Sequence, residues 1–163
     1  AELKERLVLR KIIWLPGIKG KDITDAHVDF YARFVRPGVV IVNLDTDPQS
    51  YDHQVTLAHL EILKKATDAD GRPLQIHTIS PPIKPRKSKF NQNNPDFAAG
   101  YINYFVINGA IIAPEFGDKE ADKKAYDLLS KLYPERKVEL LNIDAIAAGG
   151  GGIHCVTSHQ PQA

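Results

Sequence analysis

The sequence predicts an α/β fold in which one unit, strand-strand-helix-strand, occurs twice. Two observations lead to this prediction. Short segments alternate apolar with polar residues or are continuously apolar, as strands are, and two longer segments place apolar residues at helical spacing. These segments follow one another in the same order over about residues 28–79 and again over about 101–142. Because such units cannot cover their own sheet faces, we expect them to stack against copies of themselves.

The first unit opens with a predicted hairpin. Residues 27–35 (HVDFYARFV) and 39–45 (VVIVNLD) read as two strands joined by a Pro37-Gly38 turn. A helix is expected from about Tyr51 to Ala66, because apolar residues recur there along one side. The strand PLQIHTI, residues 73–79, completes the unit.

The second unit repeats this order after a long loop over residues 80–99. Residues 101–107 (YINYFVI) and 110–114 (AIIAP) flank Asn108-Gly109, and Asn-Gly between apolar runs is a strong hairpin signal. A helix is expected to start near Asp118, a suitable N-cap, and to stop at Pro134. The strand KVELLNI follows, and a further strand, KIIWLP (residues 11–16), is predicted ahead of both units.

The end of the chain, AAGGGGIHCVTSHQPQA, holds its only cysteine, Cys155. Two sets of residues alternate here, which predicts a strand: Ile153, Cys155 and Thr157 in one set, and His154, Val156 and Ser158 in the other. The four preceding glycines suggest a backbone that turns tightly or lets another group approach closely. Cys155 is therefore a candidate functional residue.

Composition excludes some classes of function. The net charge of +1 gives no global field for nucleic acid or an anionic membrane, so we expect neither as a partner. No apolar run approaches the roughly 20 residues of a spanning helix. A single cysteine cannot form an internal disulfide, which favours a reducing, cytoplasmic location. The chain starts at Ala1 and contains no methionine, so we expect a processed chain or a fragment.

His27 and Asp29 form the second candidate constellation. On a strand they would point to the same face, which suits a histidine and a carboxylate that share a site. Taken alone, a His-x-Asp pair is more often a surface pair or a core histidine, and a lone cysteine is usually inert. His154, Cys155 and His159 have irregular spacing for a metal site, and no Gly-x-Ser-x-Gly turn is present for a serine hydrolase.

Three motifs in order nevertheless resemble the C-terminal half of the agmatine deiminase and bacterial-type peptidyl-arginine deiminase family. They are WLPGIKG…ITDAHVDFYARFVRPGVV, YINYFVINGAIIAPEFGD and GGGGIHCVT. The resemblance covers essentially the whole chain and is weakest over residues 80–99. It implies a pentein-type α/β propeller of five strand-strand-helix-strand blades, of which this chain would form a part.

The resemblance also implies roles for individual residues. Cys155 matches the nucleophile, His27 the acid/base histidine and Asp29 a carboxylate that holds the substrate guanidinium, while Gly151 and Gly152 line the substrate site. Neither a metal nor an organic cofactor is implied. Ala26 stands where the family usually has Gly, which is tolerable if φ is negative there, and Gly152 stands where the family usually has Asn.

The implied activity is hydrolytic deimination of a guanidinium through a covalent amidino-thioether on the cysteine. The leading substrate is agmatine, giving N-carbamoylputrescine and ammonia for putrescine biosynthesis; peptidyl arginine, giving citrulline, is the alternative. A non-catalytic pentein-like module with an inert cysteine is the contrasting hypothesis. Because the family's other guanidinium-binding carboxylates come from its N-terminal half, we expect these 163 residues alone to be inactive. We also expect them to form a homo-oligomer or to associate with that half.

Overall fold

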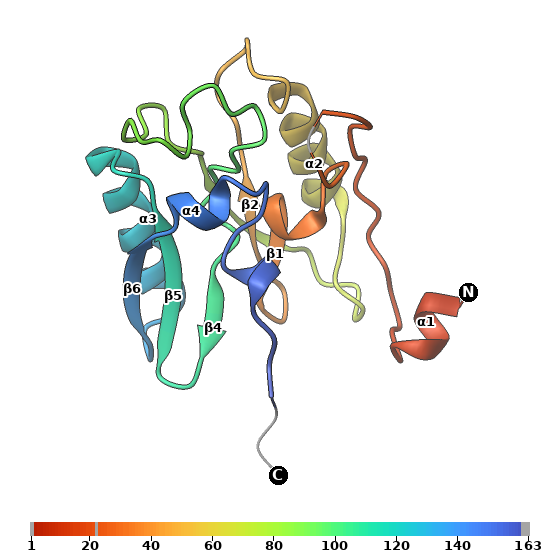
Figure 1. Cartoon of the computed structure of the whole chain (residues 1–163). Coiled ribbons are helices and arrows are strands. Elements are labelled where there is room, and N and C mark those ends of the chain that lie inside the picture. Colours follow the sequence, from red (N-terminus) through yellow and green to blue (C-terminus); the bar gives the residue numbers. More distant parts are fainter. Residues whose placement is uncertain (1, 22, 161–163) are drawn as a thin grey trace.

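Two three-stranded sheets, each accompanied by one long helix, make up most of the described structure (Figure 1). The computed structural model describes residues 2–21 and 23–160. In each sheet an antiparallel hairpin is followed by a helix and by a third strand that runs parallel to the second. The fold is therefore α/β, with the same order of elements in both sheets.

The first sheet forms from the predicted hairpin and the strand after the helix. Its elements are β1 (Ala32–Arg36), β2 (Val39–Asn43), α2 (His53–Lys65) and β3 (Gln75–Ile79). Gly38 at the hairpin turn has φ +77°, a left-handed conformation that favours glycine. All five residues of β2 are buried, as expected for the central strand of the sheet.

The second sheet has the same turn chemistry and a well-defined helix start. Its elements are β4 (Phe105–Ile107), β5 (Ala110–Glu115), α3 (Lys119–Leu132) and β6 (Lys137–Asn142). Gly109 has φ +77°, and the Asp118 side chain accepts a hydrogen bond from the Ala121 backbone N–H. The predicted Asn-Gly turn and N-cap are both confirmed.

The main core lies between the second sheet and α3 and extends to the first sheet. It includes Ile41 of β2, Ile111 of β5 and Leu129 of α3, each 0% exposed. A smaller apolar cluster, Val40, Val42 and Leu63, packs on the other side of β2. No helix in the described residues is long and apolar enough to cross a membrane.

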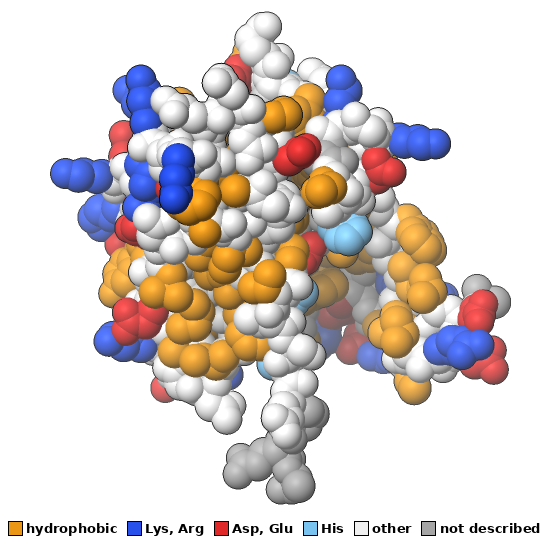
Figure 2. Space-filling model, viewed as in Figure 1, with side chains coloured by type: hydrophobic (Ala, Val, Ile, Leu, Met, Phe, Trp, Pro, Cys, Tyr) orange, Lys and Arg blue, Asp and Glu red, His pale blue; other side chains and the backbone are white. Residues whose placement is uncertain are grey.

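One face of the second sheet remains partly open. Ile107 of β4 and Leu141 of β6 are 39% and 49% exposed, in contrast to the buried residues that face α3. Figure 2 shows hydrophobic side chains gathered over this part of the molecule, beside the C-terminal segment. The second sheet is thus covered by a helix on one face and exposes apolar side chains on the other.

The strand predicted over residues 11–16 is absent. Ile13 and Leu15 pack against the small apolar cluster, and the Pro16 carbonyl oxygen lies 2.6 Å from Nε2 of the buried His59. The apolar alternation in this segment therefore reflects packing on one side of an irregular chain. A short exposed helix, α1 (Glu2–Arg6), precedes it.

The two segments that carry the candidate residues are also not strands. Residues Val28–Phe30 and His154–Val156 form short 3₁₀ helices, η1 and η2. The backbone N–H groups of Phe30 and Val156 bond to the carbonyl oxygens of His27 and Ile153, three residues earlier, at 3.1 Å and 3.3 Å, and so are not available for a strand ladder. Alternating residues therefore do not share a face in either segment. A one-turn helix, α4 (Asp144–Ala147), leads into the glycine run.

Candidate active site

Four side chains from three distant parts of the sequence form one cluster, which includes the exposed Cys155 thiol. Asp29 lies in η1, shortly before β1, and Asn103 is separated from β4 by Tyr104 alone. His154 and Cys155 lie in η2, after the glycine run. The entries to two hairpins and the end of the chain thus build one cluster.

Asn103 connects the members of this cluster. Its Nδ2 donates to Asp29 Oδ2 at 3.0 Å and lies 3.4 Å from Cys155 Sγ. Its Oδ1 accepts from the His154 backbone N–H at 2.9 Å. The residue is 0% exposed, so its amide is oriented by these partners and not by solvent. Asn103 therefore fixes the thiol and the carboxylate relative to each other.

The segment that carries Asn103 is itself held on both sides. The Tyr101 hydroxyl donates to Asp122 Oδ1 at 2.8 Å, and the Tyr104 and Tyr133 hydroxyls lie 2.8 Å apart. Burial raises the pKa of Tyr101 and Tyr104 far above the usual tyrosine value, so both remain neutral. The Arg33 guanidinium donates to the backbone oxygens of Ile102 and Tyr104. These bonds give the Asn103 amide a rigid support.

Asp29 makes all of its described side-chain contacts through one oxygen. Oδ2 lies 2.7 Å from His154 Nδ1, 3.0 Å from Asn103 Nδ2 and 3.7 Å from Cys155 Sγ. The side chain is 18% exposed, so the group is accessible from one side. A carboxylate can accept hydrogen bonds at both oxygens, and Oδ1 is the atom that remains for a ligand.

Two of the glycines before Cys155, Gly150 and Gly152, are required by close approach or by backbone conformation. A Cβ on Gly152 would lie 2.3 Å from Asn103 Oδ1, and Gly150 has φ +78°. A Cβ on Gly151 would make an ordinary 3.4 Å contact with the Cys155 Cβ. A larger residue at position 152, such as the asparagine usual in the resembled family, would therefore need Asn103 to move.

The structure does not unite His27 with this cluster. His27 is exposed, precedes η1 and donates its backbone N–H to Thr24 Oγ1 at 3.2 Å. No described side-chain contact joins it to Asp29 or Cys155, and the prediction that His27 and Asp29 share a strand face is wrong. The 3₁₀ turn between them rotates Asp29 toward Asn103 instead.

The residues before His27 have an unusual backbone. Asp25 and Ala26 have φ values of +53° and +71°, so the condition of a negative φ at Ala26 is not met. Each non-glycine residue in this region costs on the order of 1 kcal/mol. Asp25 Oδ1 accepts from the Gly20 backbone N–H at 2.6 Å, which helps to hold the loop. His27 is therefore presented by a strained turn.

Asn103 and His154 were not predicted as site residues. The signal for Asn103 is a polar residue inside the apolar run YINYFVI, where a buried amide needs partners. His154 was considered only as a metal ligand. In the described part of the chain, no three His, Cys, Asp or Glu side chains are placed to hold a metal ion.

The arrangement suits attack on a planar cation. A carboxylate that accepts N–H donors from a guanidinium would hold the central carbon of that group near the adjacent thiol. Thiolate is the side-chain nucleophile best able to attack such a poor electrophile.

Comparison with known proteins gives consistent matches over the whole chain. The family model of Porphyromonas-type peptidyl-arginine deiminase matches residues 1–161. The agmatine deiminase of Medicago truncatula is 37% identical over 98% of this chain and 47% of its own length. The agmatine deiminase of Pseudomonas fluorescens is 35% identical, with 99% and 47% covered.

A solved structure of the agmatine deiminase of Enterococcus faecalis superposes with a TM-score of 0.88 at 28% identity. The superposition covers 99% of this chain and 47% of that one. The chain thus spans about half the length of the relatives it matches.

Proposed function

The chain belongs to the Porphyromonas-type peptidyl-arginine deiminase family, and from this premise we propose that its site serves the hydrolytic deimination of a guanidinium substrate. The observation that carries the proposal is the exposed Cys155 thiol, 3.7 Å from Asp29 Oδ2 and 3.4 Å from Asn103 Nδ2. A cation-binding carboxylate beside a nucleophile is what this reaction needs.

In the proposed reaction, Asp29 accepts N–H hydrogen bonds from the guanidinium and Cys155 attacks its central carbon as a thiolate. The carbon–nitrogen bond to one terminal nitrogen then breaks, and ammonia leaves after protonation. Water adds to the amidino-thioether, the carbon–sulfur bond breaks, and a ureido product and the free thiol result. A general acid and base for these steps contributes roughly 10²–10⁴-fold in rate.

We assign the proton transfers to His27 from the family resemblance. In the structure His27 is exposed and outside the cluster, so the proposal requires it to approach Cys155 when substrate is bound. Gly151 and Gly152 keep the backbone beside the thiol free of side chains, which supports their place in the substrate site.

We propose agmatine as the substrate, with N-carbamoylputrescine and ammonia as products. The support is that relatives from Medicago truncatula and Pseudomonas fluorescens, at 37% and 35% identity, are both named agmatine deiminase. The name of the matching family model supports peptidyl arginine as the alternative substrate. Agmatine and peptidyl arginine differ beyond the guanidinium, so the residues that contact that remaining part of the substrate decide between the two.

We further propose that residues 28–79 and 101–142 are two blades of a five-bladed pentein propeller. The shared element order and the TM-score of 0.88 support this. Two blades cannot close such a ring, and the apolar face in Figure 2 suits contact with further blades. The remaining blades would come from the N-terminal half of the family fold or from another copy of this chain. We propose the cytoplasm as the location of this assembly.

The experiment that tests the proposal uses a haloacetamidine, which carries an amidinium next to a displaceable halide. In a preparation that releases ammonia from agmatine, mass spectrometry should place the amidine adduct on Cys155. Cys155→Ala should abolish turnover, and Cys155→Ser should nearly do so, with ammonia and carbamoylputrescine as the readout. An active preparation without an adduct on Cys155 would refute the assignment. Slow thiol alkylation that guanidine ligands do not change would favour the non-catalytic module.

A further inference from the structure

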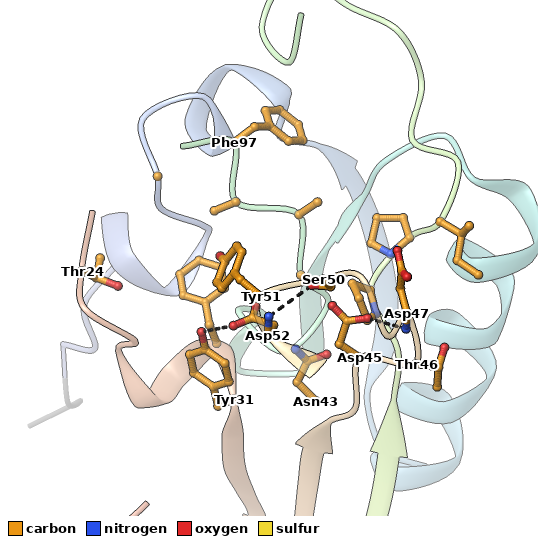
Figure 3. A pocket seen from close by; sticks show the side chains of 18 residues that line it. Thr24, Tyr31, Asn43, Asp45, Thr46, Asp47, Ser50, Tyr51, Asp52 and Phe97 are labelled. Atoms are coloured by element: carbon orange, nitrogen blue, oxygen red, sulfur yellow. Dashed lines mark hydrogen bonds between the residues drawn. The ribbon is translucent and has the colours of Figure 1, made fainter. Parts of the chain in front are cut away.

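A cavity of about 470 Å³ lies at the end of β2 and is distinct from the thiol cluster (Figure 3). None of Asp29, Asn103, His154 and Cys155 lines it. Asn43, the last residue of β2, is part of its wall, and the chain that follows β2 forms one side. Because Asn43 donates its backbone N–H to Tyr31 O, the cavity lies at the end of the sheet where β1 begins.

The cavity is acidic. Asp45, Asp47 and Asp52 line it, and no Lys, Arg or His is among its lining residues. Asp45 is only 8% exposed, and the one described partner of its carboxylate is the Asp47 backbone N–H, 2.9 Å from Oδ1. Asp52 Oδ1 accepts from the Tyr31 hydroxyl at 2.7 Å. The backbone N–H orients the Asp45 carboxylate without neutralising it, and a buried anion is costly unless a cation pairs with it.

Asn43 provides an independent indication of a ligand. The residue is 8% exposed, and its side-chain amide makes no hydrogen bond with any residue in the described part of the chain. Figure 3 shows this amide directed from the end of β2 into the cavity. The amide faces the open cavity and not another described side chain, so its placement at the wall fits a polar group that enters from outside.

The opposite wall is apolar. It is formed by residues from the two ends of the long loop between β3 and β4, namely Pro81, Pro82, Ile83, Phe97, Ala98 and Ala99. A ligand that satisfies both walls has a cationic head and a hydrocarbon stem. The carboxylates are not arranged as a metal site, since no three acidic, His or Cys side chains among the described residues could hold an ion.

We infer that this cavity binds an aliphatic amine. Its ammonium group donates to the Asn43 amide oxygen and to the carboxylates of Asp45 and Asp47, and its hydrocarbon chain packs on the apolar wall. An ammonium has three donors and one charge, which match one amide and a pair of carboxylates. This inference does not depend on deimination, because no residue of the thiol cluster takes part.

The test is a titration of the ¹⁵N-labelled chain with butylammonium and, separately, putrescine, followed in ¹H–¹⁵N spectra. The Asn43 side-chain amide signals should shift and saturate, whereas butanol and butyrate should leave them unchanged. Asp45→Asn keeps the acceptor for the Asp47 N–H but removes the charge, so Kd should rise at least about tenfold. Asp127→Asn, on an exposed carboxylate of α3 paired with Lys123, is the matched control and should leave Kd unchanged.

Two further variants complete the test. Asp47→Asn removes the charge of an exposed side chain and should also weaken binding, which keeps the inference testable if Asp45→Asn does not fold. Asp29→Asn should leave Kd unchanged, because Asp29 belongs to the other site. The inference is overturned by shifts that do not saturate, by an unchanged Kd in folded Asp45→Asn and in Asp47→Asn, or by loss of binding in Asp29→Asn.

Discussion

The side-chain amide of Asn103 lies between the Asp29 carboxylate and the Cys155 thiol, 3.0 Å from the first and 3.4 Å from the second. The same amide receives the His154 backbone N–H through its oxygen. A single buried side chain therefore sets both the position of the nucleophile and the orientation of the group proposed to hold the cation.

Replacing Asn103 should disturb this arrangement. Asn103→Ala removes one buried partner of the Asp29 carboxylate and the side-chain acceptor of the His154 N–H, so stability should fall by about 1–3 kcal/mol. Turnover in an active preparation should fall more than the loss of folded protein explains, because the thiol is no longer aligned. Urea unfolding and agmatine kinetics on the folded fraction measure the two effects. Asn91→Ala, in the 80–99 loop, is a control for loss of a half-buried amide contact outside the site, here with the Arg86 backbone oxygen.

His27 and Asp29 should separate in their kinetic effects. His27→Ala should lower mainly kcat, because a proton-transfer group acts in the transition state. Asp29→Ala should weaken binding and turnover together, because the guanidinium loses its carboxylate. Steady-state kcat and KM for agmatine are the measurement. A near-normal kcat/KM in either variant would contradict the role given to that residue.

Ala26→Gly should stabilise the protein. Ala26 has φ +71°, where glycine is relaxed and alanine is strained, so a gain on the order of 1 kcal/mol is expected, reduced by the extra freedom of glycine in the unfolded chain. Ala58→Gly, within α2, should instead cost about 0.5–1 kcal/mol. Equilibrium urea denaturation compares the two. Destabilisation by both substitutions to the same extent would show that the Ala26 conformation carries no strain.

How far the sequence predicts this fold depends on the range of the interactions involved. The Pro37-Gly38 and Asn108-Gly109 turns and the Asp118 cap are local, and each was predicted from two or three neighbouring residues. The alternation around His27 and Cys155 was read as strand, but both segments close local 3₁₀ bonds and turn toward Asn103. The conformation of both segments depends on their contacts with Asn103, which lies more than 50 positions away from each of them. No local sequence pattern could predict these contacts.

The sequence predicts only part of the site, again because some of its residues are brought together only by tertiary contacts. Cys155 and Asp29 were identified from motifs, whereas Asn103 belongs to a run read as an apolar strand, and its contacts with both are visible only in the folded chain. The acidic cavity combines the end of β2 with two loops and the glycine run, so its composition follows from tertiary structure alone.

A further prediction concerns the 163 residues by themselves. Asp29 is the only carboxylate within the described thiol cluster, and Cys155 is exposed, so a bound guanidinium would remain largely in contact with water. One carboxylate in a high-dielectric setting holds a cation weakly. We therefore expect little or no release of ammonia from agmatine by this chain alone.

The same geometry predicts association. Exposed Ile107 and Leu141 on the open face of the second sheet favour contact with another polypeptide, so light scattering should show an oligomer at micromolar concentration. Adding the N-terminal half of a family member should shift the chain into a mixed complex and raise ammonia release, because the family resemblance implies that this half would supply further carboxylates and exclude water. Ile107→Lys should weaken both effects, whereas Lys119→Ala, at the exposed start of α3, should change neither. Full activity from a monomer of this chain would show that Asp29, Asn103 and Cys155 suffice without a partner.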